Sequence, residues 1–238
     1  MDSDAAFGLQ KLTLLDFPGR MAATVFVPQC NVRCPFCHNA FLVAPDADLR
    51  QSLWSAPALF DFLSKRAGVI EGVCITGGEP LLYSGIAELA AGIKACNLAV
   101  KLDTNGSFPD RLKELISAGL VDYVAMDIKN ALNKYEMTAN VNNPELLEKI
   151  KKSIELLKSG AIDYEFRTTV LHPLHAPADF EAIGKLLTGA KRYFLQKFVD
   201  SGGLLDRELE MTAFSDDEMR ECLRIVRQYV PETQLRGM

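Results

Sequence analysis

Short apolar runs rich in β-branched residues alternate along this chain with longer amphipathic segments, and this alternation constrains the fold more than any other feature. We expect strands at Ala22–Val27, Gly72–Thr76, Leu98–Asp103, Tyr123–Ile128, Tyr164–Val170 and Tyr193–Phe198. Helices are expected near Leu53–Arg66, Gly85–Cys96, Asp110–Ala118, Pro144–Ser159, Ala178–Thr188 and Ser215–Tyr229. This repetition predicts an α/β fold of parallel strands with outer helices, either a partial TIM-type (β/α)6 barrel or an open wound sheet.

The 238 residues contain no Pro/Ser-rich linker, low-complexity tract or fixed-period repeat, so we expect a single domain. Its parts would be a lead-in at 1–21, a core at about 22–200 and a C-terminal helix at about 215–230. A net charge of −5 without a basic run argues against general binding to nucleic acid or membrane surfaces. No apolar stretch approaches the roughly 18 residues of a membrane span, and the acidic start does not resemble a signal peptide. We therefore expect a cytoplasmic protein.

Three of the six cysteines crowd into the segment Cys30-x3-Cys34-x2-Cys37, directly after the first expected strand. Three thiolates in one segment predict a metal centre, and thiolates suit both zinc and iron–sulfur clusters. Structural zinc takes four protein ligands, and His38, the nearest candidate, would strain a tetrahedral site because it adjoins Cys37. The motif favours an iron–sulfur cluster with one open iron, and a zinc-binding structural module is the alternative. The isolated cysteines, expected to be small buried hydrophobic residues, are Cys74, Cys96 and Cys222.

Further polar and ionisable residues follow the later strands at their carboxyl ends. Parallel α/β folds place their active sites at this edge of the sheet. They are Thr76-Gly77-Gly78-Glu79-Pro80, Asp103-Thr104-Asn105-Gly106, Asp127-Ile128-Lys129, Arg167, His172 and His175. Their convergence on one edge predicts a site there, whatever family the motifs belong to.

The cysteine motif, followed by Gly77-Gly78-Glu79-Pro80, resembles the radical S-adenosylmethionine (SAM) superfamily. The stretch Thr13–Arg20, running into Val25–Asn39, is similar to the branch that activates glycyl-radical enzymes, and within it to anaerobic ribonucleotide reductase activating proteins. The resemblance is close over Leu12–Leu42, good through Lys129 and looser afterwards. It implies that Cys30, Cys34 and Cys37 hold a [4Fe-4S] cluster whose open iron chelates SAM. Reductive cleavage would then yield methionine and a 5′-deoxyadenosyl radical that abstracts hydrogen.

The same resemblance assigns cofactor-binding roles next to the cluster. Gly77 and Gly78, which lack Cβ atoms, would let the backbone approach the cofactor closely, and Glu79 would bind the SAM ammonium group. Phe36 matches an aromatic position that packs near adenine, and a plain core aromatic is the alternative reading.

Asp103, Thr104 and Asp127 match positions that help to bind a monovalent cation and the carboxylate region of SAM, and oxygen ligands suit a hard cation. Strand alternation puts Asp127 and Lys129 on one face. They would stand beside the cofactor if that face is the barrel interior, or form a salt bridge at the rim.

Arg167 resembles the arginine that contacts the SAM carboxylate, and an ion pair with Glu165 on the same strand face is the alternative. His175 or His172 would contact SAM or an incoming peptide, or else lie on a surface loop. Gln196 is a weaker candidate for a hydrogen bond into the barrel.

The resemblance implies an activase that removes hydrogen from a backbone glycine of a partner, anaerobic ribonucleotide reductase by similarity, with flavodoxin or ferredoxin as electron donor. A small-molecule enzyme such as a 7-carboxy-7-deazaguanine synthase is the alternative. Those enzymes typically carry Gly-Glu-Gly where this chain has Asp16–Gly19, which favours the activase. Since no second cysteine-rich segment follows Cys37, one cluster is expected.

Overall fold

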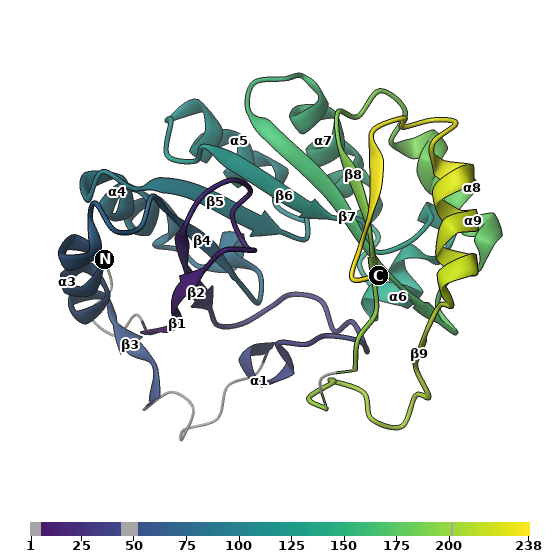
Figure 1. Cartoon of the computed structure of the whole chain (residues 1–238), viewed down its shortest axis with the longest axis horizontal. Helices are drawn as coiled ribbons and strands as arrows, with labels where there is room; N and C mark the ends of the chain where they lie inside the picture. Colours follow the sequence, from purple (N-terminus) through teal and green to yellow (C-terminus); the bar gives the residue numbers. More distant parts are fainter. Residues whose placement is uncertain (1–5, 44–51, 201) are drawn as a thin grey trace. The chain divides into compact units, whose positions relative to one another are not determined.

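A computed structural model describes residues 6–43, 52–200 and 202–238 (Figure 1). The strands are β1 (Ala6–Thr13), β2 (Ala22–Val27), β3 (Trp54–Ser55), β4 (Gly72–Gly77), β5 (Ala99–Thr104), β6 (Tyr123–Asp127), β7 (Asp163–His172), β8 (Tyr193–Lys197), β9 (Thr212–Ala213) and β10 (Thr233–Arg236). The helices are α1 (Ala40–Val43), α3 (Ala56–Arg66), α4 (Ile86–Ala95), α5 (Pro109–Ser117), α6 (Tyr135–Ala139), α7 (Leu146–Lys158), α8 (Pro177–Leu186) and α9 (Asp216–Val226).

The chain divides into two compact units. The first comprises Met1–Asn31, Phe41–Thr104 and Phe108–Val124, and the second comprises Val32–Ala40, Asn105–Ser107 and Ala125–Met238. Strand β6 runs from the first unit into the second.

In the first unit the strand order is β3-β1-β2-β4-β5. Strand β2 pairs in parallel with β4, and β4 with β5, whereas β1 is antiparallel to both β2 and β3. Strands β2 and β4 are nearly continuous apolar runs, as expected for strands covered on both faces. Helix α3 begins at Ser55, whose Oγ accepts a hydrogen bond from Ala58 N at 3.4 Å, as an N-cap should.

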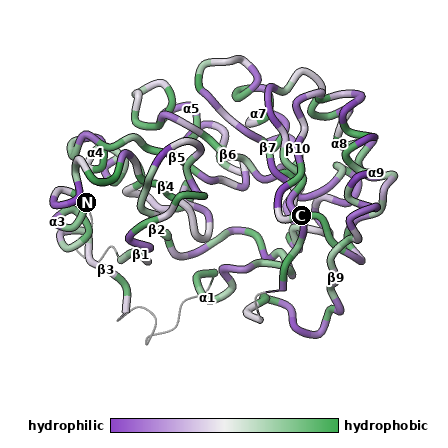
Figure 2. Tube along the Cα trace, in the orientation of Figure 1, coloured by the Kyte–Doolittle hydropathy of each residue, from purple (hydrophilic) through white to green (hydrophobic). Residues whose placement is uncertain are grey.

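In the second unit β7 lies between β6 and β8, and β10 adds in parallel to the far side of β8. Strand β9 is antiparallel to the end of β7. Helices α8 and α9 pack together, and Figure 2 shows hydrophilic and hydrophobic residues alternating along both. Helix α9 starts with a capping box in which Ser215 Oγ accepts from Glu218 N and the Glu218 carboxylate accepts from Ser215 N.

The predicted α/β class with parallel strands and covering helices is confirmed, and every expected strand and helix is present with bounds shifted by a few residues. Strands β1, β3, β9 and β10 were not expected. Within the described ranges, no helix is long and apolar enough to cross a membrane.

Candidate functional site

The cysteine segment leaves β2 at its carboxyl end and docks on helix α6. Cys30 belongs to the first unit, and Cys34 and Cys37 belong to the second. Ala139 O, at the end of α6, accepts a hydrogen bond from Arg33 N at 2.9 Å and lies 3.9 Å from Cys34 Sγ. Among the residues that the structure describes, no three Cys, His, Asp or Glu side chains form a preformed metal site. The ligand assignment therefore depends on the chemistry and spacing of the thiols.

The two glycines at the end of β4 lie against the chain just before Cys30. Gly78 N donates to Val27 O at 2.8 Å, and Glu79 N donates to Gln29 O at 2.8 Å. A Cβ on Gly78 would lie 1.8 Å from Gln29 O, and one on Gly77, where φ is +114°, would lie 2.6 Å from Val27 O. Both positions therefore need glycine because the neighbouring backbone leaves no room for a Cβ. This structural reason exists in addition to the cofactor role that the resemblance implies.

Glu79 is fully buried, and its Oε1 accepts two hydrogen bonds, from Leu81 N at 3.0 Å and from Thr104 Oγ1 at 2.8 Å. Thr104 thus joins the end of β5 to the turn after β4. A buried carboxylate held in this way is oriented before any ligand arrives, as an ammonium-binding group requires.

Asp103, also assigned to the cation by resemblance, forms an ion pair with the buried Lys101 on the same face of β5. Lys101 Nζ also lies 3.7 Å from Sγ of the fully buried Cys74, its register partner on β4. The Asp103 carboxylate therefore has a cationic partner supplied by the chain.

Asp127 pairs with two cations. Its Oδ2 lies 3.0 Å from Lys129 Nζ, and its Oδ1 lies 3.0 Å from both Nε and Nη2 of Arg167. Burial alone would raise the pKa of Asp127, but Lys129 and Arg167 outweigh it and lower that pKa to about 2. The salt-bridge reading of Asp127 and Lys129 thus describes this structure, and Arg167 joins it. Glu165 binds Arg236 on β10 through both of its oxygens, at 2.7 and 2.9 Å.

Lys129 faces the cysteine segment as well as Asp127. Its Nζ lies 5.9 Å from the ring centre of the buried Phe36. Burial lowers the pKa of Lys129, but Asp127 and the Cys34 thiol outweigh it and raise that pKa above the ordinary value. Burial raises the pKa of the Cys37 thiol, and Lys129 opposes that change. An ammonium beside two thiols stabilises their anionic form, which is the form that binds iron.

A contact between the loops after β6 and β7 fixes the backbone of Lys129. His175 is 3 % exposed, so the surface-loop reading of that residue is wrong. Its Nε2 lies 2.9 Å from Lys129 O, and its Nδ1 lies 3.3 Å from Leu171 O. A neutral ring that donates from Nε2 to Lys129 O and accepts at Nδ1 from Leu171 N, 3.4 Å away, supports the backbone of Lys129. The contact with SAM that the resemblance implies for His175 stays a prediction. Burial lowers the pKa of His175, which favours the neutral ring.

Asn130 is a buried residue that the sequence analysis missed. Its Nδ2 donates to Thr138 Oγ1 and to Leu174 O, both at 2.9 Å, and its Oδ1 accepts from Ala131 N at 2.8 Å. One amide thereby joins the loop after β7, the turn after β6 and helix α6, where the cysteine segment docks. Nothing in sequence periodicity singles out this asparagine.

The weaker candidates lie elsewhere. His172 stacks on Phe214, with ring centres 4.0 Å apart, and its Nε2 lies 3.3 Å from Glu218 Oε1. Gln196 pairs with Arg236 in the register of β8 and β10. His38 is exposed, with its ring centre 5.8 Å from that of Phe198.

The donor set fits the cofactors that the resemblance implies. Three thiols stand in one short segment, a cation lies beside two of them, and a buried oriented carboxylate follows two glycines packed against the chain before Cys30. Soft thiolates suit an iron–sulfur cluster. Anionic and cationic side chains are suitable partners for the amino and carboxylate groups of an amino-acid ligand.

Comparison with known proteins identifies the same family that the sequence resembles. The family model described as the radical SAM superfamily matches residues 24–187. The chain is 30 % identical, over 96 % of its length and 94 % of the relative, to a protein of Methanocaldococcus jannaschii named "Putative glycyl-radical enzyme activating enzyme". It is 26 % identical to a 7-carboxy-7-deazaguanine synthase of Clostridium acetobutylicum over 60 % of this chain and 65 % of that protein. A domain of pyruvate-formate lyase-activating enzyme from Bacteroides vulgatus has a similar fold, with a TM-score of 0.56 and 16 % identity over 70 % of this chain and 99 % of that domain.

Proposed function

This chain belongs to the radical SAM superfamily, and from that premise we propose that it activates a glycyl-radical enzyme by removing a hydrogen atom from a backbone glycine. The observation that carries the proposal is the 30 % identity over 96 % of the chain to a relative named for that activity. The match to the deazaguanine synthase covers only 60 % of the chain.

The cofactors of this family are a [4Fe-4S] cluster and SAM, and we propose that Cys30, Cys34 and Cys37 hold the cluster. When bound, the two cofactors supply one-electron chemistry. One electron from a reduced donor and one hydrogen atom from glycine convert SAM into methionine and 5′-deoxyadenosine, and the glycine keeps the unpaired electron. We assign the donor role to a flavodoxin or ferredoxin.

In this proposal, side chains of the protein bind SAM and orient it. We assign the SAM ammonium group to Glu79, whose carboxylate accepts a hydrogen bond from Thr104. Gly77 and Gly78 let this turn pack against the chain just before Cys30. We assign the binding of the SAM carboxylate to Lys129 and Arg167, which both pair with Asp127. Phe36 excludes water beside Lys129.

The cation partners found for Asp103 and Asp127 bear on the proposed monovalent-cation site. Because Lys101 and Lys129 already neutralise these carboxylates, we expect activity without added potassium or sodium. Substituting a bulky organic cation for those ions in the assay buffer tests this expectation.

We propose anaerobic ribonucleotide reductase as the partner and the cytoplasm as the location, both from the sequence resemblance. The test is anaerobic. Protein reconstituted with iron and sulfide is reduced, mixed with SAM and a candidate glycyl-radical enzyme, and followed by electron paramagnetic resonance (EPR) of the glycyl radical and by release of 5′-deoxyadenosine.

The cysteine variants provide the control for this assay. Cys30→Ala, Cys34→Ala and Cys37→Ala should lose iron and SAM cleavage, whereas Cys96→Ala should keep both. Release of 5′-deoxyadenosine without a glycyl radical on any partner, together with formation of 7-carboxy-7-deazaguanine, would favour the alternative enzyme. Loss of the cluster in Cys96→Ala but not in Cys34→Ala would refute the ligand assignment.

A further inference from the structure

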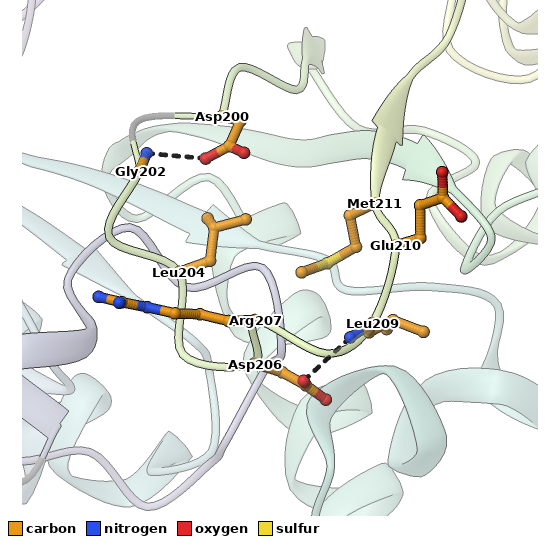
Figure 3. Close-up of a pocket in the computed structure, with 8 residues that line it drawn as sticks. All are labelled: Asp200, Gly202, Leu204, Asp206, Arg207, Leu209, Glu210 and Met211. Carbon is orange, nitrogen blue, oxygen red and sulfur yellow. Dashed lines mark hydrogen bonds between the residues drawn. The ribbon is translucent and has the colours of Figure 1, made fainter.

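A loop of the second unit carries a pocket beside the cysteine segment. Residues of the loop between β8 and β9, which the structure describes at 198–200 and 202–211, line a cavity of about 340 Å³ (Figure 3). Parallel α/β folds place their working loops after the carboxyl ends of the strands, which is where this loop begins. The described residues between β8 and β9 form no helix or strand, and long loops of this kind in compact folds are usually functional.

The loop is attached to the cysteine segment. Asp206 N donates to Pro35 O at 3.1 Å, and Pro35 lies between Cys34 and Phe36. At the start of the loop, the ring of Phe198 lies against that of His38. Whatever enters the pocket therefore lies close to the proposed cluster-binding segment.

The pocket is shaped by the loop itself. Asp206 Oδ1 accepts hydrogen bonds from Glu208 N at 2.9 Å and Leu209 N at 3.1 Å, and Asp200 Oδ1 accepts from Gly202 N at 2.7 Å. These bonds curve the backbone around the cavity before any partner binds, which lowers the entropy cost of binding.

The lining has both apolar and charged parts. Figure 3 shows the Met211 side chain extending toward Leu204, and Leu209 adds a third apolar side chain. A methionine in such a wall adapts to side chains of different shape.

The charge of the lining is acidic. Three carboxylates, those of Asp200, Asp206 and Glu210, line the pocket together with a single guanidinium, that of Arg207. Glu210 is exposed on the rim. An apolar wall with an acidic rim is complementary to a segment that carries one apolar and one basic side chain.

We propose that this pocket docks the segment of the partner enzyme that bears the reacting glycine, with an apolar side chain between Leu204 and Met211 and a lysine or arginine against the carboxylates. The inference rests on the proposed activase function and adds to it the chemistry of the sequence that this chain recognises. A pocket attached to the cysteine segment would hold a flanking residue while the glycine reaches the cofactors.

The test measures peptide binding to the anaerobically reconstituted full chain, using fluorescence anisotropy. The probe is a labelled peptide with a central glycine flanked by arginine and leucine, and the comparison peptide has glutamate in place of arginine. Glu210→Lys and Leu204→Asp should each weaken binding of the arginine peptide roughly tenfold, and the glutamate peptide should bind at least as weakly. Glu232→Lys, with the same charge change at an exposed site before β10, should bind the arginine peptide like the unmodified chain.

Equal affinity for the two peptides, binding that both pocket variants leave unchanged, or no binding at all would overturn the docking proposal. Circular dichroism of each variant shows whether the fold is retained, and Glu210→Lys, on the exposed rim, is the variant expected to keep it. If the proposed function fails instead, no partner acquires a glycyl radical even though the arginine peptide binds and the variants weaken it, so the two failures are distinguishable.

Discussion

Replacing Gly78 with alanine tests whether the close approach of β4 to the chain before Cys30 holds the cofactor-binding turn. The new Cβ would lie 1.8 Å from Gln29 O, so the two must separate by about 1.6 Å to reach ordinary contact at 3.4 Å. That movement breaks the hydrogen bonds from Gly78 N to Val27 O and from Glu79 N to Gln29 O. At about 1 kcal/mol for each bond, plus residual strain, the free energy of unfolding should fall by about 2 to 3 kcal/mol.

Urea unfolding at constant m-value measures this loss, and calorimetric titration measures SAM affinity. SAM should bind roughly tenfold more weakly, because the shift of Glu79 carries its carboxylate away from the position that Thr104 defines. Gly203→Ala is the matched control, since its Cβ would meet nothing within 4 Å. We expect that variant to change stability by less than about 0.5 kcal/mol. Stability and SAM affinity of Gly78→Ala equal to those of Gly203→Ala would refute the packing argument.

Two further perturbations address the second unit. The pKa of Asp127 is lowered to about 2, so its ion pairs stabilise the fold above its ordinary pKa of 3.8 and lose that effect as the pH falls toward 2. Asp127→Asn should therefore destabilise apo-protein by about 1 to 2 kcal/mol at neutral pH, after allowance for solvent screening, and the difference should vanish near pH 2. A difference independent of pH in urea titrations would contradict this. Asn130→Ala removes three hydrogen bonds and should cost about 3 kcal/mol, with altered EPR of the reduced cluster. Thr233→Val, which removes one buried hydrogen bond to Val230 O before β10, should lower stability but leave that spectrum unchanged.

The parallel strands could be predicted because their burial on both faces leaves a strong sequence signal. Strands β2 and β4 are short apolar runs, and both appear where expected. The residues of β1 are mostly partly buried or exposed, and β10 has four residues, so neither produces such a run. Pairing with β2 and β8 makes them strands, and pairing partners are not encoded locally.

The contact between Asp127 and Lys129 was predictable from their spacing of two residues, although β6 ends at Asp127 and Lys129 lies just beyond it. The site was less predictable where it depends on neighbours. Arg167 binds Asp127 because β7 lies beside β6, and Glu165, its expected alternative partner, binds Arg236 some 71 residues later. Asn130 lies in the loop after β6, and loops lack the hydrophobic periodicity by which strands and helices are predicted from sequence.

Because β10 pairs with β8 from near the C-terminal end of the sequence, the second unit can complete its sheet only late in synthesis. Strand β8 is complete about 40 residues before β10 leaves the ribosome, so a nascent chain presents the β8 edge to solvent through that interval. In the same interval Arg236, whose guanidinium binds the buried Glu165 carboxylate in the folded chain, has not yet been released from the ribosome. An open strand edge is a surface on which chains aggregate. Chains that stall before Thr233 should therefore depend most on chaperones.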